Sequence, residues 1–529
     1  MDIFIHNTRT RTKERFQPGS PDDVSIYVCG PTVYDRVHIG NGRPAVVFDV
    51  LVRVLRLFYK NVRYVRNITD IDDKINAAAQ AIAEPIAELT DRFAEAYQED
   101  VAALGVLDPT VEPRATSHIP EIIDMIDLLI ARGHAYEAEG HVLFDVPSDP
   151  DYGSLSQRSL TDMIDGARVE VAPYKRDPKD FVLWKPSAAD LPGWESPWGR
   201  GRPGWHIECS AMIHKHLGPS IDIHGGGNDL TFPHHENELA QGRCAGDHAN
   251  YVRYWMHNGM LTMGTEKMSK SVGNIVTIQE LLETHDGEVL RYALLSGQYR
   301  QSLVWEERLL VQARSSLDTL YQALRIGTAD RSNTSHAYAD SPAAAFPDAV
   351  LEALTDDLNT PVALAALHAI ASKIHTTASE GEKSELREQL LAGGWLLGIL
   401  NTPAEQYFQT NASLDSASIQ ALIDERQDAR TARDFGRADE IREQLLENGI
   451  ELEDLVATAA GATLDAIRVF DASKGANFPT VARQWMVARW QWPWEGCRPR
   501  PGRYWRWCWI GMANGSCISI RRTARRIRR

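Results

Sequence analysis

Cysteine is scarce in this chain, and no run of apolar residues is long enough to cross a bilayer. Six cysteines spread over 529 residues are too few for the disulfide framework of a small secreted protein. Cysteines that meet in the fold therefore favour thiolate chemistry or metal binding. The first residues also lack the apolar core of a signal peptide, so we expect a protein that acts in the cytoplasm and contacts no membrane.

Positive charge is scarce over most of the chain. The formal net charge is −16, which argues mildly against a nucleic-acid partner. Residues 480–529 nevertheless hold twelve Arg, no Lys and one acidic residue, a net of +11, so the rest carries −16 − 11 = −27. Because phosphate attraction is local at physiological salt, an acidic protein can still bind RNA through a basic patch.

The length exceeds what one hydrophobic core organises, so three or more domains are expected. From Val24 to Asp73 the pattern reads strand, loop, helix, strand, with the helix from about Pro44 to Phe58. Another strand pattern, Ile221 to His224, precedes three glycines, and residues 136–203 between them indicate an insertion. Helical patterns dominate from Gln279 onward. The predicted fold is therefore an α/β Rossmann-type core with a parallel sheet, an inserted domain and an all-α C-terminal region.

The loop between the first strand and its helix has the features of a phosphate site. His38, Gly40 and Asn41 stand where the strand pattern gives way to the helix. A glycine-bearing loop lets the backbone approach phosphate, and a helix N-terminus carries positive partial charge. The side chains of His38 and Asn41 could each donate a hydrogen bond to a phosphate oxygen.

Two further segments fit a nucleotide as well. Lys267 and Lys270 lie in a polar loop flanked by glycines, and paired lysines suit a polyphosphate whose charge shifts during reaction. A solvated surface loop is the alternative for this pair. Gly225, Gly226 and Gly227 follow a predicted strand, where ligands of such sheets bind.

Four residues suit a metal ion. Helical spacing places His234 and Glu238 on one face, and Cys29 and Cys209 each lie beside a segment of the predicted sheet. Two thiolates, an imidazole and a carboxylate are acceptable zinc ligands. The alternative is that the cysteines are small buried residues and that His234 and Glu238 belong to a solvated helix face, and the spacing alone does not favour zinc over it because no CxxC pair is present.

Several separated motifs in a fixed order resemble those of the cysteinyl-tRNA synthetases, a family of class I aminoacyl-tRNA synthetases. His38 to Asn41 corresponds to the HIGH signature, with Asn in its last position as in some members, and Lys267 to Ser271 is KMSKS. The resemblance extends from about residue 2 to Asp454, and its other motifs are Trp205–Ser210, His224–Leu230 and Phe232–Glu238.

This resemblance implies an activity and its ligands. The chain would activate L-cysteine with ATP and Mg²⁺ and transfer it to tRNA(Cys), acting as a monomer. It implies one zinc ion per subunit, held by Cys29, Cys209, His234 and Glu238. It further implies catalytic roles for His38, Asn41, Lys267 and Lys270, ATP contacts from His38, Gly40, Asn41, Gly225, Gly226, Gly227 and Lys270, and a cysteine pocket of Thr69, Trp205 and Asp229.

The resemblance also divides the chain. The expected parts are two halves of the catalytic domain (1–114 and 204–263), a connective insertion (115–203), a KMSKS loop and stem-contact region (264–310), a helical bundle (311–400), an anticodon-binding helical region (401–455) and an Arg- and Trp-rich tail (456–529). The tail shows no periodicity or caps, so we predict disorder there, with RNA binding by its interleaved arginines and aromatics as the alternative.

Two other functions fit parts of the pattern. A cysteine ligase that passes the amino acid to an amino sugar, as in mycothiol synthesis, shares both signatures and the metal ligands but lacks the anticodon-binding end. In this chain Phe435 stands among the arginines of two predicted helices, 419–433 and 437–447, an arrangement that suits unpaired bases or a solvated helix pair. A non-catalytic tRNA-binding paralogue is disfavoured because His38 and the lysines of KMSKS are intact.

Overall fold

A four-stranded parallel sheet forms the centre of the fold in the computed structural model, which describes residues 1–157, 172–246, 251–264, 266–267, 275–326, 333–410, 416–432 and 434–447. The strand order is β10-β9-β3-β4, and all neighbours run parallel. The strands are β3 (Asp23–Val28), β4 (Asn61–Arg66), β9 (Ile221–Gly227) and β10 (Val252–Asn258). The predicted Rossmann-type core is thereby confirmed.

Helix α1 (Ile39–Phe58) connects β3 to β4 and begins earlier than the predicted Pro44. His38 caps it, because its Nδ1 accepts from the Gly40 N–H at 3.1 Å. In return, Asn41 Oδ1 accepts from the His38 N–H at 3.2 Å. This reciprocal capping box satisfies the first orphan donors of the helix, so the helix starts within the HIGN segment itself.

The insertion lies between β4 and β9, as expected. Its sheet is antiparallel, with the order β5-β6-β7-β8. Between β4 and this sheet the chain forms two helices, α2 (Asp73–Ile82) and α3 (Ile86–Ala103), which are separate because Ala83 adopts a left-handed backbone and Pro85 cannot continue a helix. The insertion contains α4 (Ile119–Ala131), β5 (Ala135–Ala138), β6 (His141–Phe144), β7 (Phe181–Pro186) and β8 (Gly201–Pro203).

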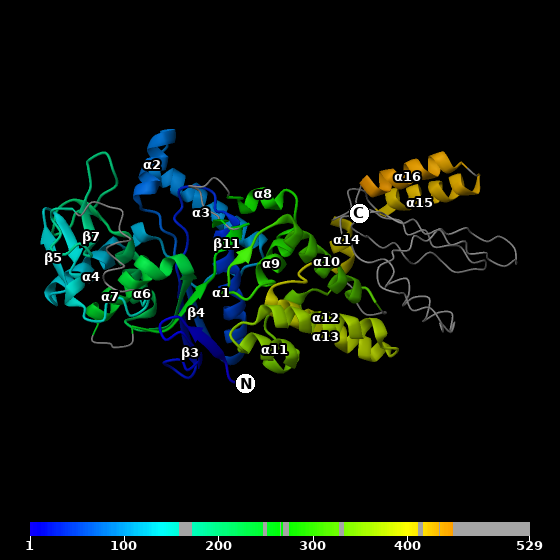
Figure 1. Cartoon of the computed structure of the whole chain (residues 1–529), viewed down its shortest axis with the longest axis horizontal. Helices are drawn as coiled ribbons and strands as arrows, with labels where there is room; N and C mark the ends of the chain where they lie inside the picture. The colour runs from blue at the N-terminus through cyan, green and yellow to red at the C-terminus, as the bar shows by residue number, and fades with distance from the viewer. Residues whose placement is uncertain are drawn as a thin grey trace, which may run out of the picture. The chain divides into compact units, whose positions relative to one another are not determined.

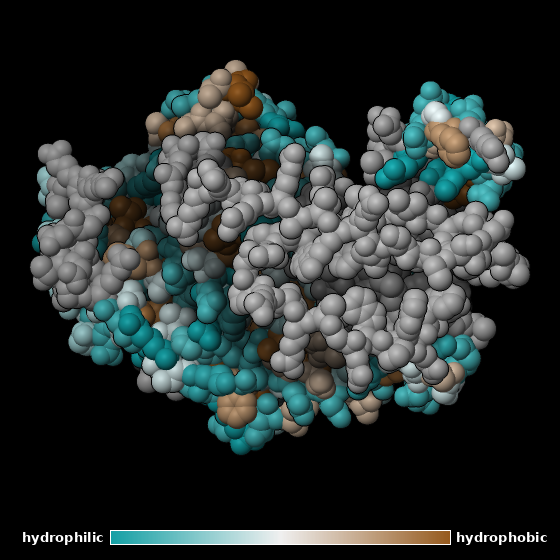
Figure 2. Space-filling view, turned by 45° about the vertical axis from the view of Figure 1, so that its right-hand side comes forward, coloured by the Kyte–Doolittle hydropathy of each residue, from teal (hydrophilic) through white to brown (hydrophobic). Residues whose placement is uncertain are grey.

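In Figure 1, α4, α6 and α7 lie beside the strands of the insertion. Figure 2 shows apolar side chains gathered over α2, whose last residue, Ile82, is 58% exposed. The remaining elements up to β11 are β1 (Phe4–Asn7), β2 (Thr12–Arg15), α6 (Trp205–Leu217), α7 (Glu236–Ala245) and β11 (Leu261–Met263).

The helical region predicted beyond Gln279 is confirmed. The chain divides into two compact units, of which the first is Met1–Asn411 and the second is Ala412–Arg529. The first unit continues with β12 (Glu266–Lys267), α8 (Ile278–Leu282), α9 (Gly287–Leu295), β13 (Leu303–Val304), α10 (Glu307–Leu324), α11 (Asp348–Thr355), α12 (Thr360–Thr376), α13 (Glu380–Leu397) and α14 (Ala404–Thr410). In the second unit, α15 (Ser416–Thr431) and α16 (Phe435–Glu447) pack side by side (Figure 1).

The tail, residues 456–529, lies outside the described residues. Within the described ranges, no helix combines the length and apolarity needed to cross a membrane.

A buried charge cluster joins α1 to α9 and α13. Asp49, Arg53 and Arg291 are at most 1% exposed. Asp49 Oδ2 accepts from Arg53 Nε at 2.8 Å and from Arg291 Nη2. The guanidinium groups also donate to the carbonyl oxygens of Trp395 and Leu397 in α13. Burial alone would raise the pKa of Asp49, but Arg291 and Arg53 hold it below its ordinary value.

We predict that Asp49→Asn lowers the free energy of unfolding by about 3–5 kcal/mol, because it leaves two buried guanidinium groups without their anion. Chemical denaturation at pH 7 measures the loss. Since the folded pKa is lowered, the carboxylate stabilises the fold above its unfolded pKa of about 4, and this contribution disappears as the pH falls through the folded pKa. The difference between the two proteins should therefore narrow in acid.

The matched control is Asp356→Asn. Asp356 pairs with Lys13 at the surface, where both side chains are about half exposed. This substitution should change stability by less than about 1 kcal/mol. Equal effects of the two substitutions would contradict the role assigned to the buried cluster.

Candidate functional site

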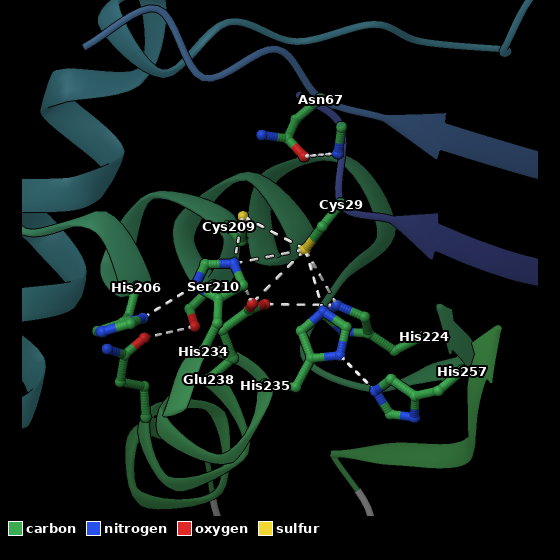
Figure 3. A network of polar contacts seen from close by, with 12 residues as sticks. Cys29, Asn67, His206, Cys209, Ser210, His224, His234, His235, Glu238 and His257 are labelled. Carbon is green, nitrogen blue, oxygen red and sulfur yellow. Dashed lines mark hydrogen bonds and ion pairs between the residues drawn. The ribbon is translucent and has the colours of Figure 1, made fainter. Parts of the chain in front are cut away.

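Four buried side chains converge at the carboxyl ends of β3 and β9 (Figure 3). Cys29 directly follows β3, Cys209 lies in α6, His234 lies in the π-helical turn Thr231–His235, and Glu238 lies in the first turn of α7. Their potential ligand atoms all lie within 4.8 Å of one another. The structure therefore brings together the residues whose zinc-ligand role the family resemblance implied.

The distances within this cluster match those of a tetrahedral metal site. The two sulfur atoms are 3.8 Å apart, and His234 Nε2 lies 3.5 Å from Cys29 Sγ and 3.7 Å from Cys209 Sγ. Tetrahedral zinc with its usual bond lengths requires about 3.8 Å between sulfurs and about 3.5 Å between sulfur and nitrogen. The distance between His234 Nε2 and Glu238 Oε1 is 2.8 Å. This is shorter than the separation of two ligand atoms bound to the same zinc ion, and it has the length of a hydrogen bond.

Neighbouring side chains orient His234. Its Nδ1 lies 2.8 Å from His206 Nδ1, and the indole ring of Trp205 stacks on it with ring centroids 4.2 Å apart. These contacts leave Nε2 facing the two sulfurs. Metal-binding histidines usually have such an outer partner on the second ring nitrogen.

Two more histidines line the other side of Cys29. His235 Nε2 lies 3.3 Å and His224 Nε2 lies 3.6 Å from the Cys29 sulfur, and together with Glu238 they form a second group of potential ligands. His235 is in turn paired with His257 at 2.7 Å. Sequence reasoning did not assign His206, His224 or His257 to the site. The motifs Trp205–Ser210 and His224–Leu230 contain the first two of these histidines, whereas His257 lies in no motif.

The buried donors of this cluster have strongly shifted pKa values. Burial raises the pKa of Glu238 and of Cys29 well above their ordinary values. The hydrogen bond from Cys29 lowers the pKa of Cys209 to about 7. Burial also keeps the pKa of His206 and His224 well below the usual range, so both rings are neutral. A divalent ion would allow all the acidic donors to ionise together, and the donor set therefore fits zinc.

The HIGN segment lies against the residues that follow the KMSKS loop. The N–H of Ile39 donates to the Val276 carbonyl at 3.1 Å, and the N–H of Ile278 donates to the Val37 carbonyl at 3.2 Å. The backbone of Lys267 pairs with Thr262 of β11. Lys270, predicted to contact ATP, lies outside the described residues.

The glycines predicted to cradle phosphate have close protein neighbours. A Cβ atom on Gly225 would lie 2.1 Å from the Phe48 ring of α1, and one on Gly226 would lie 2.9 Å from His235. On Gly227 it would meet Asp229 at 2.6 Å, and on Gly40 it would meet His38 at 2.7 Å. These glycines allow α1 and the site histidines to approach the strand end closely.

The predicted cysteine pocket is assembled only in part around the metal cluster. Thr69 pairs through its backbone with Pro31 and Val33, in the loop that leaves Cys29. Trp205 covers His234, as described above. Asp229 lines a cavity of about 750 Å³ together with His257, which connects it to the cluster through His235.

Comparisons with known proteins agree with this geometry. Residues 15–315 match the family described as tRNA synthetases class I (C) catalytic domain, and residues 349–401 match the DALR domain. The fold and site are those of a class I aminoacyl-tRNA synthetase. The chain is 55% identical over 457 residues to the cysteine–tRNA ligase of Parvibaculum lavamentivorans, covering 86% of this chain and 96% of that protein.

A second relative matches the chain to a similar extent. The cysteine–tRNA ligase of Rhodospirillum rubrum is 56% identical over 458 residues, covering 86% of this chain and 98% of that protein. The chain belongs to the cysteine–tRNA ligase family, and the amino-sugar ligase is not favoured. The solved methionyl-tRNA synthetase of Mycobacterium tuberculosis, in complex with methionyl-adenylate, is similar in fold, with a TM-score of 0.50 and 17% identity over 74% of this chain and 94% of that one.

We predict that Gly225→Ala lowers the free energy of unfolding by about 1–3 kcal/mol, because the added methyl group overlaps the Phe48 ring. Chemical denaturation measures the change. In the control Gly381→Ala, the nearest atom to the added carbon is 3.9 Å away in α13, and stability should stay equal or rise slightly. Unchanged stability of Gly225→Ala would contradict the packing role.

Proposed function

We propose that this chain activates L-cysteine with ATP to give cysteinyl-adenylate and pyrophosphate, and then transfers the cysteinyl group to the 3′ end of tRNA(Cys). The observation that carries the proposal is the buried cluster of Cys29, Cys209, His234 and Glu238 close to the capped HIGN helix. Membership of the cysteine–tRNA ligase family supports it. We expect a monomer that acts in the cytoplasm.

The four-residue cluster would hold one zinc ion. Zinc binds a thiolate sulfur far better than a hydroxyl oxygen, and that preference would supply selectivity for cysteine. Serine differs from cysteine by one atom, which shape alone discriminates poorly. Because the protein already supplies a full ligand set, the site would serve recognition rather than the activation of water.

The HIGN segment would address the nucleotide. In the proposed reaction, the carboxylate of cysteine attacks the α-phosphate of ATP while Mg²⁺ accompanies the phosphates. His38 and Lys270 would stabilise the negative charge that develops on the phosphate oxygens, supported by the positive end of α1. The side-chain oxygen of Asn41 accepts the hydrogen bond from the His38 N–H that caps α1. The amide nitrogen of the same side chain is therefore directed toward other partners.

Thr69, Trp205 and Asp229 would position the amino acid. Trp205 is 37% exposed while its ring stacks on a ligand of the cluster, so it can contact both the ion site and a bound substrate. The 2′-hydroxyl of the terminal adenosine is the expected first acceptor of the cysteinyl group, as the family resemblance implies.

We predict that Cys209→Ser abolishes both zinc binding and cysteine-dependent ATP–pyrophosphate exchange, because serine is a poor zinc ligand. Metal analysis of the purified protein should give about one zinc per chain for the natural sequence and far less for the variant. Cys244→Ser serves as the control, since Cys244 is buried in another part of the core and should leave zinc content unchanged. Retention of zinc and exchange by Cys209→Ser would refute the metal assignment.

The helix pair α15 and α16 is the proposed anticodon contact. Phe435 is 63% exposed at the start of α16, where an aromatic ring can stack on an unpaired base. Arg437 beside it is paired with Glu425 at 2.8 Å and Glu440 at 3.0 Å. The ring is therefore better placed than this guanidinium group to bind a base.

We predict that Phe435→Ala weakens tRNA binding by about 1–3 kcal/mol, the usual value of one stacked base. The KM for tRNA in aminoacylation should rise by one to two orders of magnitude, whereas tRNA-independent ATP–pyrophosphate exchange should not change. Phe435→Trp keeps a stacking surface and should restore binding. An unaltered KM for tRNA in Phe435→Ala would show that α16 is only a solvated helix.

A further inference from the structure

A buried amide connects the chain segments that leave β3 and β4. Asn67 directly follows β4 and is 1% exposed. Its Oδ1 accepts from the N–H of Gly30, the residue after Cys29, at 3.0 Å (Figure 3). A Cβ atom on Gly30 would lie 1.7 Å from the Asn67 carbonyl oxygen, so the glycine permits this close approach. Asn67 is therefore held tightly against the backbone beyond β3.

The amide nitrogen of Asn67 faces Thr69. Nδ2 donates to Thr69 Oγ1 at 3.3 Å in a buried hydrogen bond. The backbone of Thr69 is held as well, because its N–H donates to the Pro31 carbonyl at 3.1 Å and its carbonyl accepts from the Val33 N–H at 3.1 Å. Both the main chain and the side chain of Thr69, which is 2% exposed, are therefore fixed in place.

The Gly30 N–H sets the direction of the side-chain hydrogen bonds. A backbone N–H can only donate, so the atom of Asn67 that faces Gly30 must be its oxygen. The nitrogen of the amide then faces Thr69, and it too can only donate. The Thr69 oxygen must therefore accept this bond, and its own hydroxyl proton has to point elsewhere.

The proton of the Thr69 hydroxyl has no acceptor in the described part of the chain, where the bond from Asn67 is the one hydrogen bond of this group. Buried hydroxyls normally donate as well as accept. A bound cysteine offers acceptors in its sulfur and its carboxylate, whereas its ammonium group can only donate. A hydroxyl donor at position 69 therefore suits the first two groups and not the third.

We propose that Asn67 is a positioning residue of the amino-acid site, which holds the Thr69 hydroxyl as a hydrogen-bond donor toward the sulfur or the carboxylate of bound cysteine. The inference rests on the proposed function, because Thr69 belongs to the proposed cysteine pocket. It also explains why position 67 needs an amide. An aspartate would still accept from Gly30, but its second oxygen would take the Thr69 proton and leave the substrate without a donor.

The test compares Asn67→Asp, Thr69→Val and their double variant in cysteine-dependent ATP–pyrophosphate exchange. Thr69→Val should raise the KM for cysteine about tenfold or more, the usual effect of losing a hydrogen bond to a charged group. Asn67→Asp should raise it to a similar extent, since it turns the same proton away. The double variant should be no worse than Thr69→Val, because both changes remove one bond. The KM for ATP should stay unchanged in all three.

Asn61→Asp is the matched control. Asn61 also links β3 to β4, at the opposite ends of the two strands, where its Nδ2 donates to Asp23 Oδ1 at 2.7 Å. The same loss of an amide donor there should leave the KM for cysteine unchanged. Asn67→Ala buries no charge, so it keeps the test decisive if Asn67→Asp does not fold. It should raise the KM for cysteine in the natural sequence and have no further effect beside Thr69→Val.

Inhibition by cysteamine, which lacks the carboxylate, separates the two acceptors of the substrate. An equal loss of affinity for cysteamine and cysteine in Thr69→Val would assign the bond to the sulfur. A loss for cysteine alone would assign it to the carboxylate.

A raised KM for cysteine in Thr69→Val together with an unchanged KM in both variants of Asn67 would overturn the inference. Additive effects in the double variant, or an equal effect of Asn61→Asp, would overturn it as well. An unchanged KM for cysteine in Thr69→Val would instead refute the place of Thr69 in the proposed pocket, so the two failures are distinguishable.

Discussion

The parallel pairing of β3 with β9 is the constraint on which the site depends. It joins Val28 to Gly225, and the N–H of Cys29 donates to the Gly225 carbonyl at 3.2 Å. The pairing fixes Cys29 beside the helices that flank β9, α6 before it and α7 after it. Because glycine stands at position 225, Phe48 of α1 can reach the sheet at the same point. Helix α1 and the cluster of Cys29, Cys209, His234 and Glu238 therefore meet at one strand end.

Burial gives this arrangement its chemistry. Groups that would ionise easily in water are held where charge is costly, so the pKa values of Glu238 and Cys29 rise and the neighbouring imidazoles stay neutral. Neutral imidazoles are good ligands and good outer partners. A bound cation would let the acidic donors ionise together, so the cluster fits an ion better than it fits a catalytic dyad.

Helix α1 is also anchored to the helical region. Asp49 of α1 forms ion pairs with Arg53 and Arg291. Both arginines also donate hydrogen bonds to carbonyl oxygens at the end of α13. The position and direction of α1 therefore depend on its contacts with the helical region as well as on its packing against the sheet. A rigid anchor of this kind suits a helix whose N-terminus must meet phosphate in a defined orientation.

The sequence by itself determined the parallel core, the insertion, the helical C-terminal region and the family, since periodicity and motif order are local properties of the chain. It also indicated Cys29, Cys209, His234 and Glu238, but the spacing alone did not favour a metal cluster over two buried cysteines and a solvated helix face. Only the tertiary structure decided this, because ligand distances depend on how strands 195 residues apart, such as those of Cys29 and His224, are paired. The same holds for the contact of His206 with His234 and for the packing of Gly225 against Phe48, because both depend on how separate elements pack against one another.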